Sequence, residues 1–466
     1  MSKNNIEEVN TNIYDFKNED EYDYKINKGL SEDIVLEISK QKNDPEWMRD
    51  IRLNALKVYN DLELPSWGPD LSELNMEEIA TYVRPKADKA STWEDVPDNI
   101  KDTFERLGIP EAEREALAGV GAQYDSEVVY HSIRMELMAQ GVIYTDMETA
   151  VRDYPDIVKE YFMKAVPVSD HKFAALHAAV WSGGSFVYVP KGVTVDMPLQ
   201  SYFRLNSPES GQFEHTLIIV DEGASLHFIE GCSAPKYSKI NLHAGCVELY
   251  VKKGAYLRYS TIENWSKNMM NLNTKKAIVE EGGTMEWVSG SFGSHISMLY
   301  PMSVLNGKYA KTEFTGISFA GATQNLDNGF KAILNAPNTS AVVNAKSLSK
   351  NGGKCTYRSL IKATPNAINS KASVSCESLM LDDISVSDTI PVNDIETDSI
   401  EFSHEAKIGK ISDKTIFYLM SRGISEADAL ALIVRGFAYP ISKELPLEYA
   451  MEMNNLIGLE LEGSIG

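Results

Sequence analysis

Cysteine is scarce in this sequence. Only four cysteines occur among 466 residues, at Cys232, Cys246, Cys355 and Cys376, and no two of them form a CxxC pair. Four isolated thiols exclude a disulfide framework of the kind that holds small secreted domains together. Because CxxC pairs are missing, the sequence also lacks the local signature of a permanent zinc site or a ferredoxin-type cluster.

The common catalytic motifs are missing as well. The sequence contains no Walker A loop, no GxSxG or HExxH motif and no GxGxxG fingerprint. The glycine pair Gly183 and Gly184 is not followed by the Lys-Ser/Thr that a phosphate-binding loop needs. We therefore expect a chain that is not an enzyme by itself and binds no nucleotide. Any ATP hydrolysis that its function requires is expected from a partner.

Long hydrophobic runs and an excess of positive charge are also lacking. The most apolar run, residues 429–434, is followed by Arg435 and is far too short to cross a bilayer, and the N-terminus has no apolar signal-peptide core. The formal net charge is −22, from 67 acidic and 45 basic residues. Such a surface repels phosphate backbones and anionic lipids. The sequence predicts a cytoplasmic protein without a nucleic-acid or membrane partner.

Helical patterns dominate the N-terminal region, residues 1–165. An acidic tail of about 25 residues comes first, and its composition is typical of disordered segments. Ser31 is the expected N-cap of the first helix, and Asp44 is expected to cap the second, with Pro45 at its first position. Further helical segments follow up to the end of this region.

The C-terminal region, residues 406–466, is predicted to form a helical domain. Residues 412–422 form its first helix, and Ser425 opens a capping box for a second helix that is expected to end at Gly436. These two helices make a compact hairpin, and a projecting hairpin of this kind is typical of elements that dock a partner.

The central region, residues 166–405, consists of short runs rich in Val, Ile, Tyr, Phe and Thr. Glycine turns separate these runs, and the steps from Gly223 to Gly254, Gly283 and Gly307 are 31, 29 and 24 residues. A repeat of this length without intervening helices favours a β-solenoid whose coils stack in parallel. The alternative is a β-sandwich or jelly roll with irregular strands, since the repeat is only approximate.

Cys232 is the first candidate for chemistry. It follows a strand-like run and lies between Gly231 and Pro235, which suggests a turn where another molecule reaches the thiol. A thiolate at such a turn can accept a sulfane sulfur, because the thiolate is the reactive form of cysteine. The simpler interpretation is a small, half-buried residue, as most free cysteines are.

Cys376, His404 and Glu405 are candidate iron ligands near the end of the β region. They can meet only if successive coils stack, and adjacent strand residues point to opposite faces, so His404 and Glu405 share a site only through a bend. The simpler interpretation places Cys376 in the core and Glu405 in solvent. Cys246 and Cys355 lie in strand-like runs and are both expected in the core.

Polar and aromatic residues occur in the β segments around Cys232, namely Arg204, Asn206, Glu263, Trp265 and Lys275. If they point into a solenoid, they form a polar interior that needs a functional reason. If they point outward, they are ordinary surface residues, and spacing alone favours neither arrangement.

At these residues the sequence resembles the SufB/SufD family of the SUF iron–sulfur cluster assembly system, and the SufB scaffold branch in particular. The resemblance covers nearly the whole chain and rests on long segments, namely residues 44–49, 64–71, 200–206, 229–235, 260–265, 403–406 and 461–466. It implies a right-handed parallel β-helix core flanked by N-terminal and C-terminal α-helical regions. It also implies a scaffold on which a transient iron–sulfur cluster is assembled.

The resemblance implies a role for each candidate residue. Cys232 matches the family's sulfur acceptor. Cys376 matches the cysteine at the subunit interface where the cluster forms, with Glu405 and, less directly, His404 beside it. Arg204, Asn206, Trp265 and Lys275 match residues of a proposed sulfur route through the β-helix interior. Glu263 belongs to the same route, although many members have Gln at that position.

The resemblance also implies partners. The C-terminal helical domain would dock SufC, an ABC-type ATPase, and the β-helix edge would pair with SufD. The cysteine desulfurase SufS, with a SufE or SufU shuttle, would supply sulfur, and apo iron–sulfur proteins would receive the cluster. Residues 379–389 lack a second cysteine that some members carry and look partly like SufD. A second copy of this chain in place of SufD is therefore the alternative partner.

Two other classes of protein remain as alternatives. A polysaccharide-cleaving β-helix enzyme would share the solenoid, and the acidic stretch from Asp382 to Asp398 offers paired carboxylates, although a solvated face explains these residues more simply. A purely structural subunit equivalent to SufD would share the fold and the docking surfaces without a sulfur-accepting cysteine.

Overall fold

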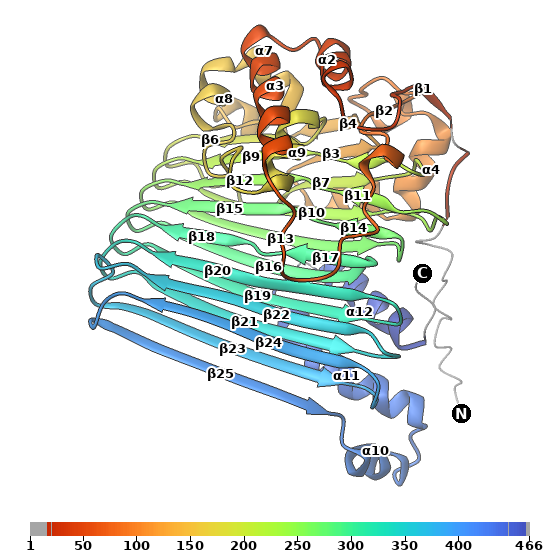
Figure 1. The fold of residues 1–466 in the computed structure, drawn as a ribbon, viewed down its shortest axis with the longest axis vertical. Coiled ribbons are helices and arrows are strands. Elements are labelled where there is room, and N and C mark those ends of the chain that lie inside the picture. Colours follow the sequence, from red (N-terminus) through yellow and green to blue (C-terminus); the bar gives the residue numbers. More distant parts are fainter. Residues whose placement is uncertain (1–15, 20, 446, 463–466) are drawn as a thin grey trace.

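The computed structural model describes residues 16–19, 21–445 and 447–462. The predicted acidic tail therefore lies mostly outside the described residues. Two large β-sheets occupy the centre of the molecule, and the N-terminal helices lie at one end of the stack of strands (Figure 1). The C-terminal helices pack against the outer face of one sheet.

The two sheets are the faces of a β-solenoid. Sheet one has ten strands and sheet two has thirteen, and neighbouring strands pair in parallel except for β3–β4 and β5–β6 at the N-terminal end. This topology confirms the predicted mainly-β solenoid with helical regions on both sides, and the sandwich alternative is wrong. Each coil takes about 30 residues because Ser225 pairs with Tyr256, which in turn pairs with Thr284.

The strands of sheet one are β3 (Gly119–Tyr124), β4 (Glu127–Ile133), β7 (Leu199–Arg204), β10 (Ser225–Ser233), β13 (Tyr256–Trp265), β16 (Thr284–Gly293), β19 (Lys311–Ala320), β21 (Ser340–Ser349), β23 (Ser370–Met380) and β25 (Ile400–Lys410). The strands of sheet two are β5 (Ile143–Asp146), β6 (Ser185–Val189), β8 (Gly211–Gln212), β9 (His215–Val220), β11 (Asn241–His243), β12 (Cys246–Val251), β14 (Met269–Asn271), β15 (Thr274–Val279), β17 (Ile296–Leu299), β18 (Met302–Leu305), β20 (Asn325–Leu334), β22 (Lys354–Ala363) and β24 (Val386–Ile395). A separate pair, β1 (Tyr22–Lys25) and β2 (Val83–Pro85), is antiparallel.

In-register parallel pairing lines up side chains in rows along the solenoid. One inward row runs Phe228, Tyr259, Trp287, Phe314 and Val343, and it forms part of the main hydrophobic core. Stacking of like residues on successive coils buries a continuous apolar column, which a single coil could not do alone. The column explains why the large aromatic residues recur at the coil spacing.

The β region extends beyond the expected limits of 166–405. Strand β3 already pairs in parallel with β7, and β25 pairs with β23 as far as Lys410. Within the expected region, residues 172–180 are helical. That segment is apolar on all sides and buried, so periodicity could not distinguish it from a strand.

The helices of the N-terminal region are α2 (Glu32–Gln41), α3 (Glu46–Asp61), α4 (Asp98–Arg106), α5 (Ile109–Ala116), α6 (Met135–Ala139), α7 (Met147–Asp153), α8 (Pro155–Tyr161) and α9 (Lys172–Val180). Ser31 caps α2 as predicted, since its side chain accepts a hydrogen bond from Ile34 N. The predicted cap on the second helix is wrong. Pro45 is the N-cap of α3, and the Asp44 carboxylate instead binds Arg52 Nε at 2.6 Å inside the helical cluster.

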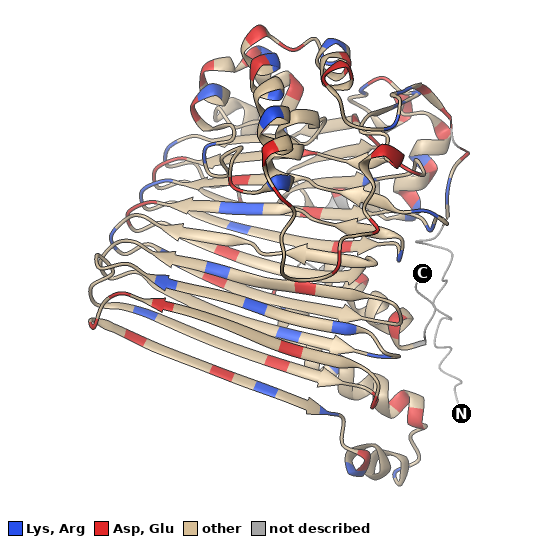
Figure 2. Ribbon diagram, in the orientation of Figure 1, with Lys and Arg blue, Asp and Glu red and all other residues tan. Residues whose placement is uncertain are grey.

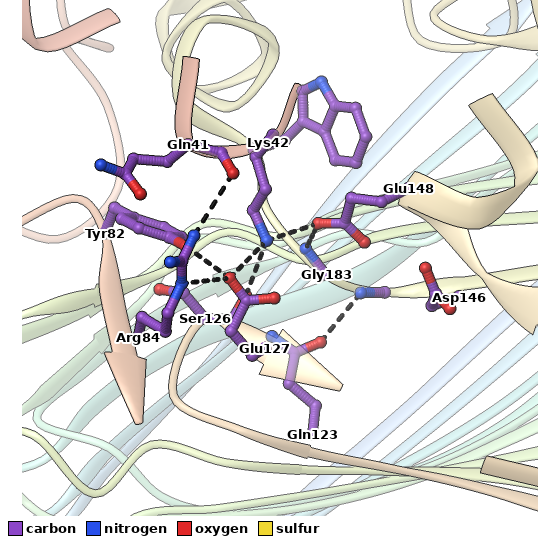
Figure 3. Close-up of polar contacts among 12 residues, drawn as sticks. Gln41, Lys42, Tyr82, Arg84, Gln123, Ser126, Glu127, Asp146, Glu148 and Gly183 are labelled. Atoms are coloured by element: carbon purple, nitrogen blue, oxygen red, sulfur yellow. Dashed lines mark hydrogen bonds and ion pairs between the residues drawn. The ribbon is translucent and has the colours of Figure 1, made fainter. Parts of the chain in front are cut away.

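A buried lysine joins α2 to the start of the solenoid (Figure 3). Lys42 Nζ lies 2.9 Å from a carboxylate oxygen of Glu127 on β4 and 2.8 Å from one of Glu148 on α7. Glu148 also accepts a hydrogen bond from Gly183 N in the turn before β6. Burial alone would lower the pKa of Lys42, but the two carboxylates raise it above its usual value, so the lysine stays charged.

The C-terminal helices are α10 (Asp413–Met420), α11 (Glu426–Ser442) and α12 (Leu447–Glu462). Ser425 caps α11 as predicted, but the predicted end at Gly436 is wrong, because the helix continues through Pro440. Ala438 and Ile441 pack into the hydrophobic cluster between α11, α12 and sheet one. This burial outweighs the low helix propensity of Gly436.

Charged residues of both signs are interspersed along the strands and helices (Figure 2). Among the described residues, every helix is too short or too polar to cross a bilayer.

Replacement of Lys42 by alanine is expected to loosen the attachment of the N-terminal helices. It removes the shared cation of two largely buried carboxylates, of which Glu127 keeps a longer contact with Arg84 at 3.9 Å, and such a loss costs about 3 kcal/mol. We expect a lower urea midpoint and faster hydrogen exchange of the α2 amides. Lys40→Ala on the same helix is the matched control, since Lys40 is 78% exposed and forms only a surface pair with Glu37. Equal effects of the two variants would contradict the role given to Lys42.

Candidate functional site

Cys232 lies inside the solenoid. It is part of β10, in register with Phe203 on β7 and Glu263 on β13, and it is 1% exposed. The predicted exposed turn is therefore wrong: strand pairing continues through the glycine before it, and the thiol points inward. Its Sγ lies 3.9 Å from a carboxylate oxygen of Glu230, two residues earlier on the same face of the strand.

A charged network surrounds this thiol. Lys275 Nζ, from β15 of the opposite sheet, lies 2.8 Å from Glu230 Oε1 and 3.3 Å from Glu263 Oε1. The hydroxyl of Tyr259 also donates to Glu230. All four side chains are buried. The interior of the solenoid at this level is thus polar and ionised, which answers the question that spacing left open for Glu263 and Lys275.

The network continues through a histidine. The side-chain amide of Asn271 donates to Glu263 at 2.6 Å, and its Oδ1 lies 2.8 Å from Nδ1 of His243. His243 Nε2 lies 2.5 Å from Glu214 Oε1. Burial alone would lower the pKa of His243, but Glu214 raises it above the usual value. Three buried acidic side chains, Glu214, Glu230 and Glu263, therefore lie beside two buried basic ones, His243 and Lys275.

These charges set the state of the thiol. Burial and the nearby carboxylates, Glu230 first, raise the pKa of Cys232 well above its usual value, and only Lys275 lowers it. Lys275 in turn lowers the pKa of Glu230 against the effect of burial. In this arrangement the carboxylate is charged and the thiol holds its proton, so Glu230 is the nearest base for that proton.

The other predicted residues of the route divide into two groups. Trp265 packs in the same small cluster as Cys232, with its ring 4.6 Å from that of His243. Arg204 lies outside the network: its Nη1 donates to Ser233 Oγ at 3.1 Å and its Nη2 to the Phe16 carbonyl at 2.6 Å. It alternates with Phe203 on β7 and therefore points to the outer face.

Asn206 also lies outside the charged network. Its backbone N–H donates to Asp125 Oδ1 at 2.7 Å, and its side-chain oxygen accepts from Asn18 N at 3.3 Å. The structure thus brings together Cys232, Glu263, Trp265 and Lys275, and it separates Arg204 and Asn206 from them.

Two further inward rows connect this network to the far end of sheet one. The first row runs Glu230, Thr261, Ser289, Gly316, Ala345 and Cys376, one residue from each successive coil. The second row begins at Cys232 and continues through Glu263, Ser291, Ser318, Ser347 and Ser378. At about 4.8 Å per strand, five steps separate the two ends of a row by about 24 Å.

The rows contain small side chains where the apolar row contains aromatic ones. A cavity of about 20 Å³ lies against Ser289, Gly316 and Ala345, roughly the room that one water molecule needs. Gly316 is required there, because a Cβ at this position would lie 2.5 Å from the ring of Phe314. The row from Glu230 to Cys376 is therefore incompletely filled at this point, beside the tightly packed aromatic column.

Cys376 ends the first row on β23. It is 2% exposed, and its Sγ lies 3.7 Å from Nε2 of His404 on the neighbouring strand β25. Burial raises the pKa of Cys376 to about 12 and lowers that of His404. Glu405 points to the opposite face of β25, where its side chain is 64% exposed and bound to Lys407 at 3.1 Å. The structure thus brings Cys376 and His404 together and leaves Glu405 apart.

A second group of potential ligands lies on the outer face of sheet two, beneath α9. The ligand atoms of His177, His215 and Cys246 lie within 4.8 Å of one another, and all three residues are buried. His177 Nδ1 is 3.0 Å from the Ala244 carbonyl, its Nε2 is 2.9 Å from His215 Nδ1, and His215 Nε2 is 3.2 Å from Glu248. Burial lowers the pKa of both imidazoles, and neutral imidazoles with a thiol are possible ligands for a soft divalent metal.

The predicted core positions of the remaining cysteines are confirmed. Cys355 packs with Ala320 and Leu326, and Cys246 is buried beside the two histidines. Sequence reasoning missed Glu214, His243 and Asn271 as members of the charged network. All three are polar residues in short β runs. That they face the coil of Cys232 can be inferred only once the register of the coils is known.

Lys275→Met is expected to destabilise the solenoid by about 3–5 kcal/mol, because Glu230 and Glu263 lose their shared cation in a dry interior. The loss of stability should be smaller at pH 5 than at pH 8. In the variant, the pKa of these two buried carboxylates is higher in the folded protein than in the unfolded chain. A lower pH therefore neutralises them first in the folded protein and removes the penalty. Urea unfolding in reducing buffer measures both effects.

The double variant Lys275→Met, Glu230→Gln is the control for this prediction. It removes one of the two uncompensated carboxylates and should recover part of the lost stability. A single variant as stable as the parent at pH 8 would show that the three side chains do not form an ionised set.

Comparisons with known proteins agree with this architecture. Residues 37–201 match the SufBD protein N-terminal region, and residues 203–437 match the SufBD core domain of SUF system FeS cluster assembly. The chain is 52% identical over 453 residues to iron–sulfur cluster assembly SufBD family proteins of Staphylococcus haemolyticus, Staphylococcus epidermidis and Staphylococcus aureus, with 97% of each chain covered. The chain belongs to the SufBD family of iron–sulfur cluster assembly proteins.

Proposed function

We propose that this chain is a SufB-type scaffold of the cytoplasm, which accepts sulfur at Cys232 and builds a transient iron–sulfur cluster around Cys376 at a subunit interface. The observation that carries the proposal is the pair of inward rows, which join the network at Cys232 to Cys376. Two cysteines at opposite ends of neighbouring inward rows of mostly small side chains are what a sulfur acceptor and an assembly site require.

Sulfur acceptance begins with a proton transfer. Glu230, 3.9 Å away, takes the proton of Cys232. The thiolate attacks the outer sulfur of a persulfide on the donor, the donor's S–S bond breaks, and the donor leaves as a thiolate. The Cys232 persulfide that forms is neutralised by Lys275, whose ammonium group already lies inside the same network. The donor is the SufS desulfurase with its SufE or SufU shuttle.

The rows provide the route to the assembly site. Two reducing thiols supplied from solution release the terminal sulfur as hydrosulfide, which restores the Cys232 thiol and leaves the reductant as a disulfide. The hydrosulfide must then move about 24 Å, from the level of Glu230 to that of Cys376. Hydroxyl groups of Ser291, Ser318 and Ser347 line one side of this path and can donate hydrogen bonds to a sulfur anion. This route differs from the one implied by resemblance, because Arg204 and Asn206 lie outside it.

The assembly site lies in the last described coil. Cys376 and His404 provide one sulfur and one nitrogen ligand, and Glu405 joins them only if β25 bends when a partner pairs with its free edge. A set of so few ligands holds a cluster less firmly than four cysteines would. Weak holding permits transfer to apo iron–sulfur proteins.

Two surfaces suit the proposed partners. β24 and β25 are the last strands of the two sheets among the described residues, and SufD, or a second copy of this chain, would pair with them. On α10, Phe417 is 71% exposed and Tyr418 is 56% exposed, which suits docking of the SufC ATPase. ATP binding by SufC would draw the docked helices together and open the interface at Cys376.

A structural, SufD-like role is the second candidate. The observation in its favour is the state of Cys232, which is 1% exposed and has a strongly raised pKa. A protonated thiol in this environment reacts slowly unless the solenoid opens. Persulfidation of Cys232 by the desulfurase system distinguishes the two candidates.

Anaerobic reconstitution with ferrous iron, cysteine and the desulfurase, in complex with SufC, tests the proposed function. We expect a cluster spectrum by visible absorption and Mössbauer spectroscopy that Cys376→Ala abolishes. Cys232→Ala should impair assembly only when the desulfurase supplies the sulfur, and inorganic sulfide should restore it. Cys355→Ala is the matched control, since Cys355 is equally buried but lies in neither row.

The same spectra decide against the scaffold if they do not depend on the two cysteines. No cluster in the parent complex, or an unchanged cluster in all three variants, would favour the SufD-like role.

Val392→Asp tests the partner surface. Val392 is 48% exposed on edge strand β24, and a carboxylate there should block strand pairing and prevent assembly with SufC and SufD, as measured by light scattering after gel filtration. Met135→Asp, on the 80% exposed Met135 of α6, is the control that should leave assembly intact. Parallel co-expression with SufC alone tests the second-copy alternative, which fails if no complex with two copies of each chain forms without SufD.

A further inference from the structure

A pocket lies against the outer face of sheet two, and its lining includes Lys275 of the network around Cys232. Its volume is about 460 Å³, the size of a small-molecule site. The connector between α3 and the rest of the N-terminal region crosses this face, and Pro65 and Trp67 of the connector line the pocket. Strands β15, β17, β18 and β20 and the N-terminal end of α9 supply the remaining walls.

The connector is held in place by aromatic contacts. The ring of Trp67 lies 5.6 Å from that of Tyr300, and the Arg358 guanidinium lies 4.9 Å from the Trp67 ring. Arg358 is itself bound to Asp327 at 2.6 Å. Gly68 follows with a φ of +88°, and a Cβ there would come within 3.0 Å of Met298. The wall formed by Trp67 is therefore a fixed part of the pocket.

The polar side of the pocket carries a surplus of positive charge, since its lining contains the acidic residues Glu63 and Asp170 and the basic residues Lys172, Lys275, Lys276 and Lys331. Lys276 Nζ is paired with Asp170 at 2.9 Å, and Lys172 Nζ is bound by the carbonyls of Tyr59 and Leu62 at 2.9 and 2.6 Å. Lys331 forms no ion pair with any carboxylate in the described part of the chain, and its Nζ lies 5.0 Å from the centre of the Tyr300 ring.

The surroundings of Lys331 disfavour the charged form of its side chain. Burial lowers the pKa of Lys331, and repulsion from Lys276 and Arg358 lowers it further, while Asp170 only partly offsets them. A bound anion would relieve that repulsion and keep the ammonium group charged. Such a local excess of cations stands out in a chain with a formal net charge of −22.

The opposite side of the pocket is apolar. Phe173, Met298, Met302 and the ring of Trp67 line it. Aromatic and thioether side chains pack favourably against flat rings. Asn273 also lines the pocket, and both of its amide atoms lack a hydrogen-bond partner in the described structure, so a donor and an acceptor remain for a ligand.

We propose that this pocket binds a small organic anion with a flat aromatic ring system, whose acidic group pairs with Lys331 and Lys276 and whose ring packs between Trp67 and Phe173. The class of ligand follows from the pocket alone, because one side of the pocket is positively charged and the other side is apolar and aromatic. The pocket and the charged network share Lys275, but Lys331, on which the test depends, lies in neither row, so ligand binding can fail without any effect on the proposed sulfur route.

Titration calorimetry with 8-anilinonaphthalene-1-sulfonate tests the proposal on the full chain in complex with SufC. This probe carries a sulfonate on a flat aromatic body, and N-phenyl-1-naphthylamine is nearly the same molecule without the charge. We expect one site for the sulfonate, with a Kd at least tenfold higher for Lys331→Gln and close to the parent value for Lys331→Arg. The neutral analogue should bind much more weakly than the sulfonate to the parent protein.

Lys362→Gln is the matched control, since it removes one cation from the same sheet without lining the pocket. It should leave the Kd unchanged. Phenyl phosphate should compete with the sulfonate at lower concentration than inorganic phosphate, because only the former has a ring. Equal Kd values for the parent and Lys331→Gln, equal binding of the charged and neutral probes, or equal competition by the two phosphates would each overturn the proposal. Circular dichroism of each variant establishes that it is folded. If Lys331→Gln does not fold, the comparison of the charged and neutral probes on the parent protein still tests the need for an acidic group.

Discussion

Parallel pairing of successive coils in strict register places every residue of one coil directly above its equivalent in the next. Because side chains alternate between the two faces of a strand, each inward position becomes a column through the molecule. A one-residue slip anywhere would turn Cys232 outward and break its contact with the Lys275 network. The aromatic column from Phe228 onward resists such a slip, since it would expose several large rings at once. The chemistry of the interior therefore depends on the packing of the adjacent apolar row.

The charged interior costs free energy of folding, which the other interactions of the fold must offset. Ions removed from water lose several kcal/mol each, and pairing recovers this only with good geometry. Here Lys275 serves two carboxylates and Tyr259 donates to one of them, so most of the lost hydration is replaced. An apolar set of the same shape would be at least as stable. Stability alone therefore does not account for ions in this place, and their effect on the pKa of Cys232 is the chemical consequence that the structure shows.

Much of the fold could be read from the sequence, because its signals are local. Ser31 indicates the start of a helix because its side chain caps the first turn. Glycine turns such as the one at Gly223, whose φ is +66°, indicate the spacing of the coils. Where a long-range contact decides the outcome, sequence reasoning went wrong. Asp44 binds Arg52 instead of capping a helix, and burial of Ile441 carries α11 past Gly436.

The candidate site was predictable only in part for the same reason. Residue types indicated Cys232 and Cys376, but which polar residues face them depends on coil register, which the approximate repeat leaves undetermined. Arg204 and Glu263 look alike in sequence, as polar residues in strands, yet one points outward and the other inward. Alternation along a strand can be applied only after one residue of that strand has been placed.

The burial of Cys232 also affects its chemical durability. Peroxide and alkylating reagents attack exposed thiolates, whereas this thiol is enclosed and protonated. The proposed role of sulfur acceptor needs a thiol that stays reduced until the donor arrives. A cysteine that becomes reactive only when its enclosure opens would remain reduced through an oxidative burst that inactivates surface thiols.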